Sequence, residues 1–249
     1  MTSGPGLYRI AGLGEIRANV RTNYTAPTHS HDGYSLAIFG GAARIRCRGG
    51  AWDVDEGCIV VLEPGEPHGG TPSSRTCVQT AILPEAAFMI RAFGSAAPIR
   101  FPRHVVDDPD LAADLARAAA GREGGVLDCL LRRLFTRHGL RAPPSAVAGR
   151  SRIEAAIGAD LDAGVAAASR RHGVSRWHFS RKLRALTGLS PRDLRRQLRV
   201  ARARTLIEGG EALASAALRA GFSDQAHMTR QLRSLLGVTP AALRGGKVA

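Results

Sequence analysis

The chain has 249 residues, of which 44% are hydrophobic and 22% charged, which excludes disorder throughout and allows two modest domains or one large domain. The formal net charge of +14 is unevenly spread: residues 1–150 carry 17 Arg against 14 acidic residues, and residues 151–249 carry 18 Arg and Lys against 7. A compact basic domain attracts nucleic acid, or less often an anionic membrane surface, so we expect the C-terminal part to bind a polyanion.

The sequence pattern of the N-terminal part changes from β-favouring to helical along its length. Residues 1–83 contain short β-favouring runs, such as YSLAIFG and GCIVVLEPG, separated by Gly and Pro, which is typical of a small antiparallel barrel. Residues 84–140 have apolar residues at helical spacing, which predicts amphipathic helices at 108–120 and 126–138. The stretch RAPPSAVAGR, residues 141–150, has the composition of an interdomain linker.

Residues 151–249 contain an internal repeat, in which AAASRRHGVSRWHFSRKLRALTGLSP corresponds to ASAALRAGFSDQAHMTRQLRSLLGVTP. In each copy a small residue lets two helices cross closely, a Gly permits the turn, and Ser175 or Ser223 falls where an N-cap is needed. A Gly-x-[Ser/Thr]-Pro then stops one helix and starts another. The repeat predicts helix-turn-helix motifs at about 164–188 and 212–237, joined by a helix over 191–208.

The segment AGFSDQAHMTRQLRSLLGVTPAALR closely resembles the C-terminal signature of the AraC/XylS family of transcriptional regulators. It departs from that pattern with Met228 at a usually aromatic position and Leu243 in place of Tyr, and both changes keep an apolar core residue. The resemblance implies an α+β multidomain protein: a cupin-like sensor barrel with following helices, then an all-α domain of two helix-turn-helix subdomains. It implies a non-enzymatic regulator that binds promoter DNA, responds to a small-molecule effector and contacts RNA polymerase.

The residues that would read DNA are those left outward once the apolar positions face the core. We place Val174, Phe179, Leu183 and Leu186 inward in the first recognition helix, and Met228, Leu232 and Leu235 inward in the second. The predicted DNA-binding residues are Arg176, Trp177, Ser180, Arg181, Arg184, Gln225, Thr229, Arg230 and Arg233. Arg can bind guanine, and Gln adenine, through two hydrogen bonds worth about 1–3 kcal/mol of discrimination. The alternatives are a solvated basic face and, for Trp177, packing on a neighbouring element.

The predicted helix over 191–208 is rich in Arg. At 1.5 Å per residue it would be about 27 Å long. Because major-groove segments recur roughly every 34 Å, such a spacer could present both recognition helices to one face of the duplex.

The stretch from PTHSHDGYS to PGEPHGG resembles a small cupin of the AraC-type sensor class. In such a barrel His29, His31 and His68 would share one cavity, serving either an effector pocket with structural hydrogen bonds or a transition-metal site. Metal-dependent cupin enzymes usually add a Glu after H-x-H, and its absence here argues against enzyme chemistry, so we expect no cofactor. The other pocket candidates are Tyr34, Arg46, Trp52 and Glu66.

Several alternatives remain at this point. The helices at 108–138 could form a homodimer surface or only pack against the barrel. The protein could be a metal-dependent cupin enzyme with an appended DNA-binding domain, or its N-terminal domain could serve oligomerisation alone. The four cysteines form no C-x-x-C pair, and the chain has neither an apolar signal segment nor a run of roughly 18 apolar residues, so we expect reduced thiols, no membrane partner and a cytoplasmic location.

Overall fold

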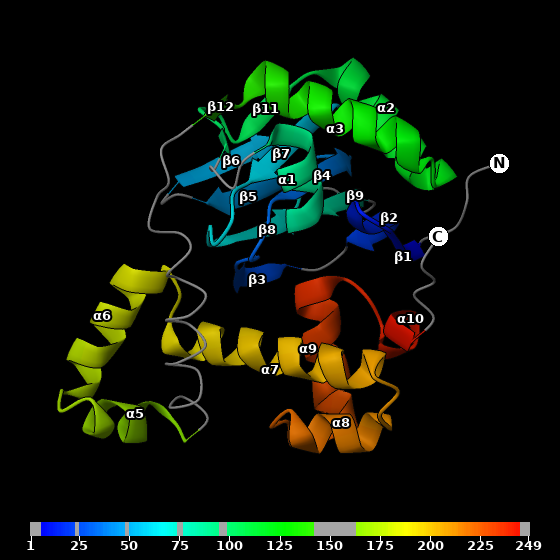
Figure 1. Ribbon diagram of the computed structural model, residues 1–249. Coiled ribbons are helices and arrows are strands. Elements are labelled where there is room, and N and C mark those ends of the chain that lie inside the picture. The colour runs from blue at the N-terminus through cyan, green and yellow to red at the C-terminus, as the bar shows by residue number, and fades with distance from the viewer. Residues whose placement is uncertain are drawn as a thin grey trace.

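The computed structural model describes residues 6–22, 25–47, 50–73, 77–94, 99–141 and 163–244. Figure 1 shows strands with helices packed over them in the N-terminal half, and only helices in the C-terminal half. This architecture confirms the predicted fold class. Residues 142–150 of the predicted linker lie outside the described residues.

Two antiparallel sheets form the barrel. The larger has the strand order β1-β2-β9-β4-β7-β11, the smaller has the order β3-β8-β5-β6, and β10 and β12 pair separately. The strands are β1 (Gly6–Ile10), β2 (Gly14–Thr22), β3 (Ala26–His29), β4 (Ser35–Gly40), β5 (Ala43–Cys47), β6 (Gly50–Val54), β7 (Cys58–Leu62), β8 (His68–Pro72), β9 (Cys77–Pro84), β10 (Ile99–Arg100), β11 (Val105–Asp107) and β12 (Leu140–Arg141). Because β11 pairs with β7, the larger sheet extends beyond the segment 1–83.

Three helices cover the outer face of the larger sheet: α1 (Ala86–Phe93), α2 (Pro109–Gly121) and α3 (Gly124–His138). Asp108 caps α2 by accepting a hydrogen bond from the Leu111 N–H at 3.1 Å. Leu115 of α2 and Leu131 of α3 are fully buried in the core that these helices share with the sheet. The predicted leucine stripes are therefore used within the domain, and a homodimer stays a prediction.

The DNA-binding half consists of α5 (Val165–Arg171), α6 (Arg176–Thr187), α7 (Pro191–Glu208), α8 (Leu213–Arg219), α9 (Gln225–Leu236) and α10 (Pro240–Arg244). In Figure 1 the long helix α7 runs between the α5/α6 pair and the α8/α9 pair. Gly188 and Gly237 end α6 and α9 in the left-handed conformation, with φ of 73° and 70°. Met228 and Leu243, which depart from the family pattern, are both buried. None of the helices in the described ranges has the length and hydropathy needed to cross a membrane.

Two local predictions in the repeat were wrong. Ser175 does cap α6, but the cap of α9 is Asp224, which accepts a hydrogen bond from the His227 N–H at 2.6 Å. The connection after Gly221 is one residue longer than in the first copy, so Ser223 falls one position too early. Leu186 is 47% exposed, and Thr187, one turn after Leu183, is buried in its place. The Thr187 hydroxyl donates a hydrogen bond to the Leu183 carbonyl at 2.9 Å, which satisfies it within the core.

Candidate effector cavity and nucleic-acid interface

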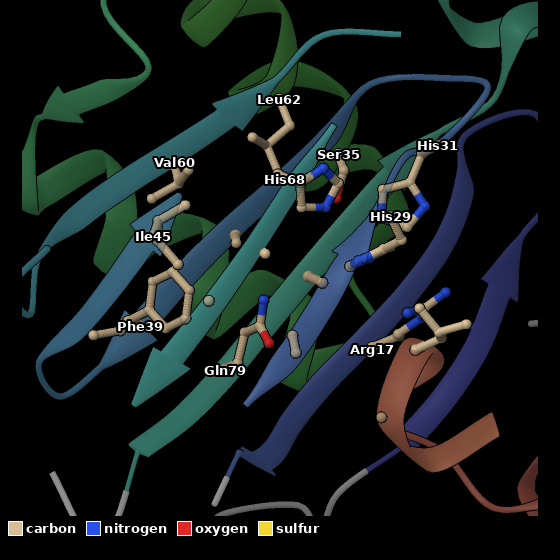
Figure 2. Close-up of a pocket in the computed structure, with 18 of the residues that line it drawn as sticks. Arg17, His29, His31, Ser35, Phe39, Ile45, Val60, Leu62, His68 and Gln79 are labelled. Carbon is tan, nitrogen blue, oxygen red and sulfur yellow. The ribbon is translucent and has the colours of Figure 1, made fainter. Parts of the chain in front are cut away.

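A cavity of about 100 Å³ lies inside the barrel, between the two sheets and the end of α9. Figure 2 shows side chains from several strands converging on it. The residues that line it are Arg17, Ala26, His29, His31, Ser35, Ala37, Phe39, Ala43, Ile45, Val60, Leu62, His68, Gly69, Gly70, Thr71, Pro72, Gln79, Ala81, Leu235, Leu236 and Gly237. The structure thus brings together the three predicted histidines and adds three residues from the DNA-binding domain.

The alternation of β4 decides which of its residues reach the cavity. Ser35, Ala37 and Phe39 point inward and line it, whereas Leu36 lies in the core under α2 and α3. Tyr34, the residue before β4, lies in the same core as Leu36, so its predicted place in the pocket is corrected. Its hydroxyl donates a hydrogen bond to the Ile99 carbonyl at 2.7 Å, and its ring packs edge-on against a phenylalanine of α3.

The three further pocket candidates also lie away from the cavity lining. Arg46 is exposed on the outer face of β5. Trp52 is half-buried, and its ring lies edge-on to His104 with the centroids 5.3 Å apart. Glu66 is buried in the turn before β8, where it accepts a hydrogen bond from the Glu63 N–H at 3.0 Å.

The three cavity histidines form a compact cluster. Their ring centroids lie 4.3–5.0 Å apart. The Nδ1 atom of His29 lies 2.8 Å from the Pro27 carbonyl, and that of His68 lies 2.9 Å from the Glu66 carbonyl. In the neutral ring each Nδ1 therefore carries the proton and donates it, which leaves Nε2 as the acceptor.

Burial and neighbouring charges keep these rings neutral. Burial, followed by the proximity of His68, lowers the pKa of His29 to about 3. Burial also holds the pKa of His31 well below 6.5 and lowers that of His68. The guanidinium groups of Arg17 and Arg196 lower the pKa of His29 further, because they disfavour a second positive charge.

The cluster has the spacing of a metal site, and two arginines lie near it. The ligand atoms of His29, His31 and His68 all lie within 4.8 Å of one another, which one transition-metal ion could bridge. Arg17 and Arg196 nevertheless place positive charge beside His29. This positive charge favours an anionic ligand, and the neutral rings offer acceptor atoms for hydrogen bonds.

Arg17 connects the cavity to the DNA-binding domain. Its side chain is 10% exposed and pairs with Glu15 at 2.8 Å, while its Nη1 donates a hydrogen bond to the Leu236 carbonyl at 2.9 Å. The last carbonyls of a helix have no partner within the helix, so a cation at this position stabilises the end of α9.

Two further contacts hold the domains together. Glu15 also accepts a hydrogen bond from Arg204 of α7. Next to His29, the Ser30 N–H donates to the Gln197 side chain at 2.9 Å. Both partners lie on α7, which Figure 1 shows beneath β3. The DNA-binding domain is therefore docked on the mouth of the cavity in this structure.

The two recognition helices present matching faces. Both have 12 residues, and Arg181 and Arg230 occupy equivalent positions. The exposed members of the predicted DNA-binding set are Arg176, Trp177, Arg181, Arg184, Gln225, Arg230 and Arg233. Ser180 and Thr229 are half-buried, and each donates its hydroxyl hydrogen to the carbonyl one turn earlier at 2.8 Å. Trp177 is 67% exposed, and the Arg181 guanidinium lies 4.4 Å from the centroid of its ring.

Comparison with known proteins identifies the family to which this chain belongs. Residues 13–123 match the family model of an AraC-like ligand binding domain, and residues 168–246 match that of a helix-turn-helix domain. The chain belongs to the AraC family. It is a DNA-binding regulator with an N-terminal ligand-binding domain, as the sequence predicted.

Solved structures of ToxT from Vibrio cholerae are similar to the chain over nearly its full length. An apo ToxT variant from strain SCE256 has a TM-score of 0.58 at 12% identity, covering 94% of this chain and 97% of that chain. Wild-type ToxT bound to an unsaturated fatty acid has a TM-score of 0.53 at 12% identity, covering 90% of each chain. At this identity the likeness concerns the fold alone. None of the curated proteins compared is similar enough to add to this comparison.

Proposed function

We propose that the chain is a one-component transcriptional regulator in which a small apolar molecule with one anionic group binds in the barrel cavity and controls how α9 is held. One observation carries the proposal. Leu235, Leu236 and Gly237, at the end of the second recognition helix, line the same cavity as the histidines. A molecule in the cavity therefore contacts the DNA-reading helix directly, and its differential contacts can shift the docking equilibrium.

The cavity lining supports this class of ligand. Phe39, Ile45, Val60 and Leu62 form an apolar wall, and Arg17 supplies a positive charge at the other side. Its volume of about 100 Å³ is several times the ~10–15 Å³ that one water requires. Because one ToxT structure carries an unsaturated fatty acid, fatty acids are the first ligands to test.

The anionic group would act through Arg17. A ligand carboxylate competes with Glu15 and with the Leu236 carbonyl for the guanidinium. Losing the bond to Leu236 weakens docking and frees the two recognition helices to adjust to successive major-groove segments. The ligand then raises the affinity for operator DNA, and by linkage DNA raises the affinity for the ligand.

Thermal unfolding of the full chain with fatty acids and with alcohols of the same length tests the ligand class. We expect the acids to raise the melting temperature of the wild type and of Arg46→Gln, which removes an exposed charge outside the cavity. In Arg17→Gln this ligand-dependent shift should be lost. Equal shifts from acids and alcohols, or an undiminished shift in Arg17→Gln, would overturn the proposal.

The remaining functional expectations belong to the same proposal. We infer no catalytic role for the cupin, because the positive surroundings of its histidines disfavour the metal that the alternative enzyme requires. A bound transition metal lost from both His29→Gln and His31→Gln would favour that alternative. Homodimer formation and contact with RNA polymerase are predictions, testable by light scattering and by pull-down. We also propose that the protein acts on promoter DNA in the bacterial cytoplasm.

A further inference from the structure

Three buried side chains of different chemistry meet at a second place in the barrel. They are the thiol of Cys47, the carboxylate of Glu66 and the imidazole of His104, which are 4%, 7% and 6% exposed. Their ligand atoms all lie within 4.8 Å of one another. They come from three segments far apart in sequence: the end of β5, the turn before β8 and the loop before β11. Only the fold brings this sulfur, oxygen and nitrogen together.

Backbone hydrogen bonds hold the Glu66 carboxylate and the main chain at His104. Glu66 accepts a hydrogen bond from the Glu63 N–H at 3.0 Å, and the Glu63 carboxylate in turn accepts one from the Phe101 N–H at 2.8 Å. The His104 carbonyl accepts a hydrogen bond from the Val61 N–H at 2.7 Å, so the main chain is anchored beside its imidazole. The turn before β8 and the segment before β11 are therefore tied to each other.

The His104 imidazole and the Glu66 carboxylate lie close to the separation expected for two ligands of one metal ion. His104 Nδ1 lies 3.7 Å from Glu66 Oε1, which is too long for a hydrogen bond. A nitrogen and an oxygen bound to one tetrahedral zinc ion, with bonds of ~2.0–2.2 Å, lie roughly 3.3–3.6 Å apart. The pair is therefore spaced as ligands of one ion after a small side-chain adjustment.

We propose that Cys47, Glu66 and His104 bind a zinc ion, with the fourth position open to water. A thiolate and a carboxylate balance the 2+ charge of the ion, and the neutral imidazole adds none, so the buried site is electrically neutral. Sulfur is a poor ligand for magnesium and calcium, which excludes the common hard cations. On binding, the Cys47 thiol releases its proton to solvent, and the sulfur–zinc bond forms from the thiolate.

This site is separate from the histidine cluster but adjoins it. Cys47 lies opposite His68 in the β5–β8 strand pair, and the His68 ring donates to the carbonyl of Glu66. His68 in turn lines the effector cavity, as Figure 2 shows. A bound zinc ion would thus stabilise the part of the cavity wall that contains His68. Binding of the ion does not depend on the proposed effector.

Cobalt substitution tests the site directly, because a thiolate bound to Co²⁺ gives an intense near-ultraviolet charge-transfer band. The full chain is freed of metal with a chelator and titrated with Co²⁺, and then with Zn²⁺ as competitor. We expect a band that saturates at one ion per chain and is bleached by Zn²⁺. Cys47→Ser should abolish the band, and the isosteric Glu66→Gln should weaken cobalt binding by at least about tenfold.

Two matched controls locate the band. Cys129→Ser removes an exposed thiol on α3, and His31→Gln removes an imidazole of the cavity histidine cluster, so both should keep the wild-type cobalt titration. Circular dichroism verifies that each variant is folded. The proposal is overturned if the folded wild type gives no thiolate band, if the band survives in Cys47→Ser, or if it is lost in Cys129→Ser or His31→Gln.

Discussion

Arg17 of the barrel donates a hydrogen bond to the carbonyl oxygen of Leu236, the last residue of the recognition helix α9, at 2.9 Å. The two residues are 219 positions apart in the chain. The same guanidinium pairs with Glu15 and lines the effector cavity. One side chain therefore joins ligand binding, domain docking and the helix that reads DNA.

Replacing Arg17 by Ala should release α9. A hydrogen bond to a charged group contributes about 1.5–3 kcal/mol, so docking should weaken by about tenfold or more. We expect a higher affinity for operator DNA without ligand, measured by fluorescence anisotropy at one fixed salt concentration. Arg46→Ala removes the same charge from an exposed site and controls for long-range electrostatics. An equal change in both variants, or none in Arg17→Ala, would contradict the prediction.

Glu15 makes the stability of the docked protein depend on pH. Burial raises the pKa of this carboxyl, but Arg17 and Arg204 outweigh burial and lower it from 4.5 to about 2. A pKa that is lower in the folded state adds stability above the unfolded pKa, and this contribution is lost as pH falls from about 4.5 to about 2. At neutral pH it amounts to about 3 kcal/mol in the free energy of unfolding.

Urea unfolding at pH 7 and pH 3 measures this contribution. Glu15→Gln should be less stable than the wild type at pH 7. The difference should shrink at pH 3, because the carboxyl is then protonated in the unfolded chain but still mostly ionised in the folded chain, which favours unfolding. Glu85→Gln changes an exposed glutamate at the start of α1 and should differ little from the wild type at either pH. A Glu15→Gln difference that is the same at both pH values would refute the assignment.

Local chemistry made the DNA-binding half predictable. The left-handed glycines Gly188 and Gly237 end helices, and the residues before Pro191 and Pro240 cap the helices that follow. Each of these effects involves only residues close together in the sequence. Such signals survive in the sequence without any knowledge of tertiary contacts. Ser223 was wrongly predicted as the N-cap of α9 because the second copy has one more residue after Gly221. An alignment of the two copies on their glycines does not show where that extra residue lies.

The barrel was harder because strand faces depend on register. Tyr34 lies three residues after the H-x-H motif and just before β4, yet it packs in the core on the side of the sheet away from the cavity. Arg17 was missed because its partner on α9 is remote in sequence. A partial signal existed: Glu15 and Arg17 are opposite charges two residues apart in a strand, so they share one face.

Arg181 and Arg230 should carry base recognition in the two half-sites. Both are exposed at equivalent positions of α6 and α9. We expect Arg181→Ala and Arg230→Ala to lower operator affinity by about 1–3 kcal/mol each, and to lower affinity for unrelated DNA much less. Arg103→Ala removes an exposed charge from the N-terminal domain as the control. Equal losses on both DNAs would make these arginines phosphate contacts instead.

Substitutions of Trp177 distinguish a contact with DNA from a packing role within the protein. It is 67% exposed, so it contributes little to the core, and the substitution Trp177→Ala should change the free energy of unfolding by no more than about 0.5 kcal/mol. The Trp177 ring positions the Arg181 guanidinium for the major groove, so Trp177→Ala should weaken operator binding. Trp177→Phe keeps an aromatic ring and should retain part of the operator affinity. Leu218→Ala, at a residue that is 66% exposed on α8, is the matched control and should alter neither quantity. A large loss of stability in Trp177→Ala, with operator affinity unchanged, would show that the ring packs on the protein rather than on DNA.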